Sequence, residues 1–203
     1  SAYKFYGPHQ GVLWGREELL NSLPAYKLRV VKDVSPGRYE TGTQSLEGQA
    51  GTHGALEYMQ WVGTTMGQEH LNDNPGHRQR TKEIHAGLKA MAIYDRMLVG
   101  HLITGLQRLP GIEVRGITNP ERFIHRVPTV SITRPDLVPS ELAKFLDEHG
   151  VYVWDGHSYG IDVIEWLGLQ DRGGVVRIGP THYNTIEEVD TALTLIGDFL
   201  SRL

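Results

Sequence analysis

The chain has 203 residues, of which 39% are hydrophobic and 22% charged, so it can bury a core and does not have the composition of a disordered protein. Its net charge of −4 leaves no basic excess of the kind that binds nucleic acid or an anionic membrane. It has no cysteine, which excludes disulfides, cysteine-ligated zinc and thiol chemistry in this chain. No apolar run could span a bilayer and residues 1–4 hold no apolar signal region, so we expect a cytoplasmic protein.

The first 70 residues predict short elements separated by turns. Residues 11–15 predict a short strand, and residues 16–23 predict a helix that ends at a proline. Residues 26–31 alternate apolar and polar side chains, which predicts another strand. Residues 44–65 predict a longer helix. Its expected buried side chains are Leu46, Ala50, Leu56, Tyr58, Met59 and Val62.

A break at residues 72–76 precedes a long helical pattern between Pro75 and Pro110. Apolar residues recur there at spacings of three or four: Ile84, Leu88, Met91, Tyr94, Leu98, Leu102 and Leu106. A helix of this length in a small protein typically links two packed bodies.

After Pro110 strands and helices alternate, which is typical of a small α/β or α+β unit. The expected strands are residues 112–117, 127–132, 151–154 and 174–178. Helices are expected at residues 140–149 and 161–167. The pattern Thr185-x-x-Glu188 is a capping box that opens the last helix.

Three segments contain residues that could carry chemistry. Lys4 lies among aromatic residues just before a Gly-Pro turn, where partial desolvation would favour its neutral, nucleophilic amine; the alternative is a solvated lysine. Gly42 and Thr43 lead into a helix, and free amides and hydroxyls there favour a bound phosphate; the alternative is ordinary N-capping by Thr43 or Ser45. Arg177 interrupts an apolar strand, so we expect it to be buried and paired with a carboxylate, either of a substrate or of the protein.

Other familiar motifs are missing from the sequence. The ten histidines include no His-x-x-x-His pair and no His-Glu-x-x-His helix, so we expect no metal site. No Gly-x-Gly-x-x-Gly or Walker-type loop occurs, and residues 156–160 resemble a Gly-x-Ser-x-Gly elbow only loosely.

Taken together and in this order, the three segments resemble the class V aminotransferase family of pyridoxal-phosphate enzymes. The resemblance is to the branch that holds cysteine desulfurases, selenocysteine lyases and isopenicillin N epimerase-like proteins. It covers essentially the whole chain and corresponds to the C-terminal half of a family member. It implies an α/β fold, the C-terminal part of the pyridoxal-phosphate-dependent transferase fold type I. Residues 1–75 would then be the remnant of the large cofactor-binding domain, residues 76–110 the connecting helix, and residues 111–203 the small α/β domain.

The resemblance also implies roles for the candidate residues. Lys4 would hold pyridoxal 5'-phosphate as an internal aldimine and then serve as the general base. Gly42 and Thr43 would reach the cofactor phosphate of the other subunit in a homodimer. Arg177 would bind the α-carboxylate of a small amino-acid substrate. Nucleic acid, membranes and metals are not implied.

Two departures from the family pattern narrow this expectation. Cysteine desulfurases use a loop cysteine upstream of the arginine, and the matching residues 155–160 read Asp-Gly-His-Ser-Tyr-Gly. A hydroxyl forms no persulfide, so an epimerase, aminotransferase or lyase is expected before a desulfurase or selenocysteine lyase. The family's aspartate for the cofactor ring nitrogen precedes the lysine and is not in this sequence, so we expect the chain alone to be inactive. The alternative is a catalytically silent structural or binding module.

Overall fold

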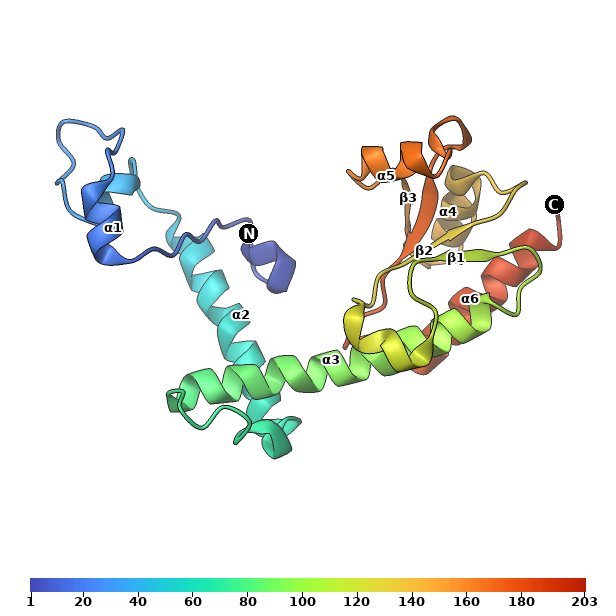
Figure 1. Cartoon of the computed structure of the whole chain (residues 1–203), viewed down its shortest axis with the longest axis horizontal. Coiled ribbons are helices and arrows are strands. Elements are labelled where there is room, and N and C mark those ends of the chain that lie inside the picture. The colour runs from blue at the N-terminus through green and yellow to red at the C-terminus, as the bar shows by residue number, and fades with distance from the viewer. The chain divides into compact units, whose positions relative to one another are not determined.

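The computed structural model describes residues 1–203 as two compact units, Ser1–Leu88 and Lys89–Leu203. Figure 1 shows the elements of both units. The long helix α3 runs from Gln79 to Leu106 without interruption, which confirms the predicted long helix. The division between the units falls inside α3, so its first turns belong to the first unit and the rest to the second.

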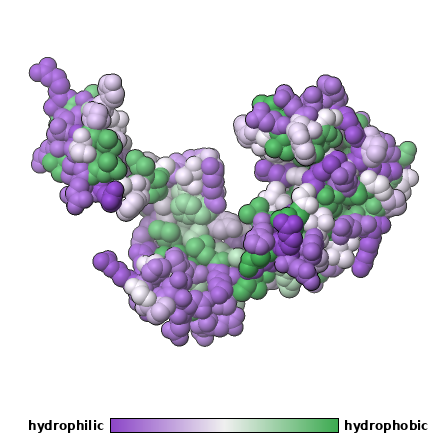
Figure 2. Space-filling view, viewed as in Figure 1, coloured by the Kyte–Doolittle hydropathy of each residue, from purple (hydrophilic) through white to green (hydrophobic).

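The first unit is built from helices and turns. They are η1 (Ala2–Phe5), α1 (Glu17–Ser22), η2 (Gly37–Tyr39), α2 (Leu46–Thr65), η3 (Gln68–His70) and the start of α3. Helices α1 and α2 confirm two predictions, but residues 11–15 and 26–31 form no strand, and both strand predictions are wrong. No strand of this unit is available to pair with them, and Leu13, Trp14 and Tyr26 stay largely exposed. Figure 2 shows hydrophobic surface around α1.

Helix α2 packs against the first turns of α3 through glycines. A Cβ atom added at Gly63 would lie 1.8 Å from the carbonyl oxygen of Glu83, and one added at Gly87 would lie 2.1 Å from that of Met59. The two backbones therefore touch where neither helix has a side chain. The buried residues of α2 are Gly48, Ala55, Met59, Val62 and Gly63, and of these Met59 and Gly63 lie at this contact. Met59 and Val62 confirm the prediction, whereas Leu46 and Ala50 are exposed.

The second unit contains an antiparallel sheet in the order β1-β2-β4-β3. Its strands are β1 (Glu113–Arg115), β2 (Val130–Thr133), β3 (Trp154–Gly156) and β4 (Val175–Ile178). Its helices, besides α3, are η4 (Pro120–His125), α4 (Pro139–Glu148), α5 (Ile161–Trp166), η5 (Gln170–Arg172) and α6 (Ile186–Leu200). All four predicted strands are present, but β3 begins at Trp154, where the prediction ended.

One face of this sheet is covered by helices (Figure 1). The core joins α3, α4 and α6 to the inward side chains of β2 and β4, among them Leu102, Leu146, Ile196, Ile132 and Val176. The predicted capping box at the start of α6 is confirmed, because Thr185 accepts from the amide of Glu188 while Glu188 accepts from the amide of Thr185. The mixture of helices and sheet confirms the predicted α/β class. None of the helices combines the length and apolarity that crossing a membrane requires.

Candidate functional site

Lys4 projects from a tightly held turn at the start of the first unit. The Gly7 amide donates to the carbonyl of Ala2 and the Ala2 amide to the carbonyl of Gln10, at 2.9 and 2.8 Å. A side chain at position 7 would meet Ala2, since a Cβ there would lie 2.9 Å from the Cβ of Ala2. Lys4 is exposed, with its Nζ 5.8 Å from the centre of the Tyr3 ring. Of the two alternatives for Lys4, this chain shows the solvated one, with an accessible amine on a turn whose backbone is held by hydrogen bonds.

Gly42 and Thr43 form an open bend just before α2. Gly42 has φ +72°, a conformation that side-chain-bearing residues rarely adopt, and nothing lies within 4 Å of its would-be Cβ. The helix is capped by Ser45, whose hydroxyl accepts from the Gly48 amide at 3.3 Å. Ser45 therefore takes the capping role that was the alternative for Thr43. The Thr43 hydroxyl is exposed and makes no hydrogen bond within the chain.

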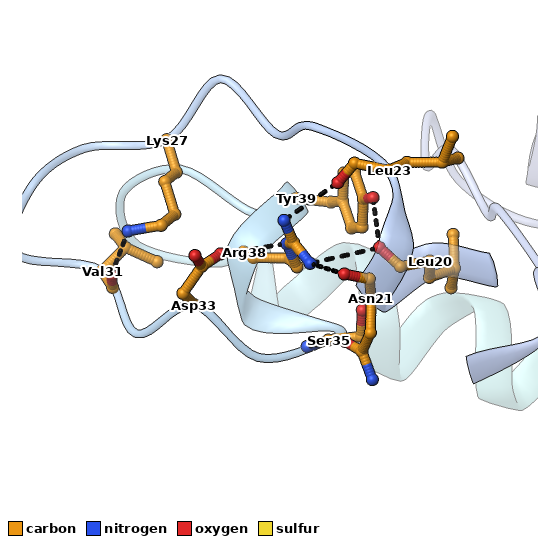
Figure 3. A network of polar contacts seen from close by, with 9 residues as sticks. All are labelled: Leu20, Asn21, Leu23, Lys27, Val31, Asp33, Ser35, Arg38 and Tyr39. Atoms are coloured by element: carbon orange, nitrogen blue, oxygen red, sulfur yellow. Dashed lines mark hydrogen bonds and ion pairs between the residues drawn. The ribbon is translucent and has the colours of Figure 1, made fainter. Parts of the chain in front are cut away.

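Arg38 organises the segment that leads to this bend, and Figure 3 shows its contacts. This buried side chain donates to the carbonyls of Asn21 and Leu23 at 2.6 and 2.9 Å, and to that of Leu20 at 3.4 Å. Its Nε also lies 3.1 Å from a carboxylate oxygen of Asp33. One guanidinium thus ties the end of α1 to the turn before Gly42. The sequence analysis missed Arg38, because its partners are main-chain carbonyls that no motif marks.

Arg177 lies on the face of the sheet opposite the helical core. In β4 the neighbouring Val176 and Ile178 are buried, whereas Arg177 is exposed. The expectation of a buried, paired arginine is therefore wrong, because the alternation of the strand turns this side chain outward. No carboxylate of this chain forms an ion pair with Arg177.

The strand register places Arg177 in a row that crosses the sheet. Ser131 of β2 lies opposite Arg177 on one side and Trp154 of β3 on the other, while Arg115 of β1 lies beyond Ser131. Arg115 is already engaged, since its Nε donates to the Thr133 hydroxyl at 3.0 Å. It also makes an ion pair of 2.7 Å with Glu113. Arg177 is therefore the guanidinium of this row that remains available to a ligand.

The loop after β3 has strained backbone. Ser158 and Tyr159 have φ values of +48° and +63°, and neither is a glycine. The Tyr159 amide donates to Nδ1 of His157 at 3.0 Å, so in the neutral ring the proton lies on Nε2. Tyr159 is 95% exposed, while the Ser158 hydroxyl is buried without a partner. The loop thus presents an imidazole and a phenol, and no thiol.

The segment after β4 is held against α3 and α6. The Tyr94 hydroxyl donates to the carbonyl of Asn184, and the Asn184 side chain accepts from the Thr181 amide, both at 3.0 Å. Burial raises the pKa of the Asp95 carboxyl on α3, an effect that nearby His182 opposes. Burial also lowers the pKa of His182, against the opposing pull of Asp95. These contacts anchor the loop that follows Arg177.

The candidate residues lie on open surface and not in the larger concavity of the second unit. That groove, of about 570 Å³, lies beside the end of β4 and the start of α6, and none of Lys4, Gly42, Thr43 and Arg177 lines it. Lys4, Gly42 and Thr43 belong to the first unit and Arg177 to the second. The chain contains no group of three or more histidine or carboxylate side chains placed to hold a metal ion.

Comparisons with known proteins bear on both units. The model of the family "Aminotransferase class-V" matches residues 1–192. A cysteine desulfurase of Synechococcus elongatus is 27% identical over 208 residues, which cover 97% of this chain and 28% of that protein. The apo structure of the cysteine desulfurase of Thermococcus onnurineus matches with a TM-score of 0.69 and 25% identity, over 93% of this chain and 42% of that one. The Escherichia coli cysteine desulfurase CsdA has the same TM-score at 22% identity, over 100% and 45% of the two chains, and shows the fold alone.

These matches agree with the predicted fold. The structural neighbours of this chain are cysteine desulfurases, and these enzymes, like class V aminotransferases, use pyridoxal phosphate. The chain spans less than half the length of the relatives described above. The chain belongs to the class-V aminotransferase family.

Proposed function

We propose that this chain is the lysine-bearing part of a pyridoxal-phosphate-dependent enzyme that acts on a small amino acid. The observation that carries the proposal is the exposed amine of Lys4 on a turn held by two main-chain hydrogen bonds, within the span that matches the family. A reactive amine must be accessible, and the turn presents Lys4 to solvent from a backbone position that is held.

The residues present fit pyridoxal phosphate in their chemistry. Lys4 offers a primary amine for the aldehyde of the cofactor. Gly42 and Thr43 offer an exposed hydroxyl and open backbone, three and two residues before the cap of a 20-residue helix whose N-terminus favours an anion. When bound, the cofactor spreads the negative charge that develops at the α-carbon of the substrate.

Each residue then has a distinct task. Lys4 would hold the cofactor through Nζ, and the same atom would accept the proton from the α-carbon of the substrate. Arg177 binds the α-carboxylate through its planar fork. Thr43 would donate its hydroxyl to the cofactor phosphate of the partner subunit, in a homodimer that shares residues between its sites.

The reaction class remains that of an epimerase, an aminotransferase or a lyase. The relatives are named cysteine desulfurases, but the loop at residues 155–160 carries Ser158 and Tyr159 and no thiol. A hydroxyl forms no persulfide, which supports a reaction at the α-carbon over sulfur transfer through this loop.

The test uses the full-length protein incubated with pyridoxal phosphate, reduced with borohydride and mapped by peptide mass spectrometry. We expect the cofactor on Lys4, together with the visible absorption of the lysine-bound form. Lys4→Ala should lose both, while Lys32→Ala, which removes an exposed lysine of the same unit, should keep both. Cofactor attached to another lysine, or a band that survives in Lys4→Ala, would refute the assignment.

Two further measurements separate the remaining alternatives. Turnover by the isolated chain with added cofactor would contradict our expectation that this chain alone is inactive. A full-length protein that binds no cofactor would instead support the silent module. Sedimentation of an active full-length protein as a strict monomer would exclude the cross-subunit role of Thr43.

A further inference from the structure

The row of side chains on the sheet face opposite the helical core places an indole beside the available guanidinium. Trp154 and Arg177 are directly opposite each other in the antiparallel pair β3–β4, so both side chains leave the same face. Their Cβ atoms are expected to lie about 4.5–5.5 Å apart. Trp154 is 62% exposed and stacks on no other aromatic side chain. A hydrophobic surface next to a free cation is the arrangement that an amphipathic anion requires.

We propose that Trp154 is the residue that selects the substrate, by packing against its side chain while Arg177 holds its α-carboxylate. This inference rests on the carboxylate-binding role proposed above for Arg177. In an α-amino acid the side chain leaves the carbon that bears the carboxylate, so a carboxylate on Arg177 brings the side chain within reach of the neighbouring indole. The substrate class is therefore an amino acid with an aromatic or large apolar side chain.

The neighbours of Arg177 on the β2 side of the row do not favour an acidic substrate. Ser131 offers only a hydroxyl, and Arg115 beyond it is paired with Glu113 and bonded to Thr133. A second carboxylate on the substrate would meet no free cation on this row, and its desolvation would go uncompensated. A very small side chain would leave the indole uncovered and so lose the apolar contact.

Helix α5 of the same unit also carries exposed hydrophobic side chains. Figure 2 shows them over that helix, where Ile161 and Val163 are exposed. Trp166 on α5 is 84% exposed and is an indole at a different place on the same unit. It therefore serves as the matched control for the loss of an exposed tryptophan.

The experiment compares amino acids on the full-length protein loaded with its cofactor. Dissociation constants come from the spectral change of the cofactor on mixing, and kcat/KM from turnover, for L-phenylalanine, L-leucine, L-alanine and L-aspartate. We expect L-phenylalanine and L-leucine to be preferred. Trp154→Ala should lower the preference for L-phenylalanine over L-alanine about tenfold, the value of one aromatic contact. Trp154→Phe should keep most of it, and Trp166→Ala should leave it unchanged.

A cofactor-free measurement gives an independent readout. In the full-length apoprotein, 3-phenylpropionate carries the carboxylate and the ring but no amine, so it should shift the indole N–H resonance of Trp154 in the NMR spectrum. Propionate should shift it less, and Arg177→Ala should abolish the effect. A preference for L-phenylalanine that is the same in wild type and Trp154→Ala would overturn the inference.

The two proposals fail in different ways. Cofactor on Lys4 with unchanged selectivity in Trp154→Ala refutes the role of Trp154 and leaves the enzyme assignment intact. No cofactor on Lys4 refutes the enzyme assignment, whatever the result at Trp154. Because Trp154 is largely exposed, its replacement should not unfold the sheet, and retained selectivity in Trp154→Phe confirms that the variants are comparable.

Discussion

Replacing Gly63 by alanine tests the glycine contact between α2 and the first turns of α3. The added Cβ would lie 1.8 Å from the carbonyl oxygen of Glu83, and real Cβ contacts essentially never fall below 3.0 Å. The obstructing atom belongs to the main chain of a helix, so no side-chain rotation relieves the clash. The two helices must move apart, and Met59 and Val62 lose part of their burial as they do so.

Gly63→Ala adds an atom to a contact that has no space for it, and such overpacking typically lowers the folding stability by about 1–3 kcal/mol. The higher helix propensity of alanine offsets this cost by up to about 1 kcal/mol. Gly54 provides the matched control, because it lies in the same helix with nothing within 4 Å of its would-be Cβ. Gly54→Ala should therefore stabilise α2 through propensity alone.

Hydrogen exchange measures this effect separately in the two units. In Gly63→Ala the amides of α2 should exchange faster than in wild type, and in Gly54→Ala they should exchange more slowly. Amides of α6, in the other unit, should keep their rates in both variants. Slower exchange of α2 in Gly63→Ala would refute the close approach of the two backbones.

Two further predictions concern polar contacts. Arg38→Ala leaves the carbonyls of Asn21 and Leu23 without this donor, while that of Leu20 keeps the Tyr39 hydroxyl. Residues 17–40 should therefore exchange hydrogen faster, by about 1–3 kcal/mol of local stability. Arg29→Ala, at an exposed site, should not change exchange there. Unaltered exchange in Arg38→Ala would contradict the network. The Thr185 amide and the Asn184 side chain donate to Glu188 and hold the pKa of its carboxyl below the usual range. The stabilisation of α6 by the Glu188 carboxylate is therefore complete above the pKa of the unfolded state, and it is lost as the pH falls through the lower pKa of the folded state. An NMR titration of the wild type, compared with Glu188→Gln, measures this dependence.

The helices of this protein are largely readable from local sequence. The spacing from Ile84 to Leu106 predicts α3, and Thr185 with Glu188 marks the start of α6. Both signals depend on residues within one or two turns of each other, so they operate before any tertiary contact forms. The order of the segments around Lys4, Thr43 and Arg177 likewise carried the family resemblance, which the match over residues 1–192 confirms.

Burial was predicted less well, because it depends on what lies opposite each residue. Leu46 is an apolar residue of the kind that cores contain but is 65% exposed, whereas Gly63 of α2 is buried because the backbone of α3 meets it. Residues 26–31 alternate like a strand and find no partner to complete the hydrogen bonds of one.

The sequence by itself determined the long helix, the capped last helix and the α/β class, since these depend on local spacing and residue type. Only the tertiary structure decided that Arg177 faces outward beside Trp154, because strand register is set by pairing between segments distant in sequence. It also decided that Arg38 binds main-chain carbonyls at the end of α1 and just after it, because main-chain acceptors leave no signature in the order of side chains.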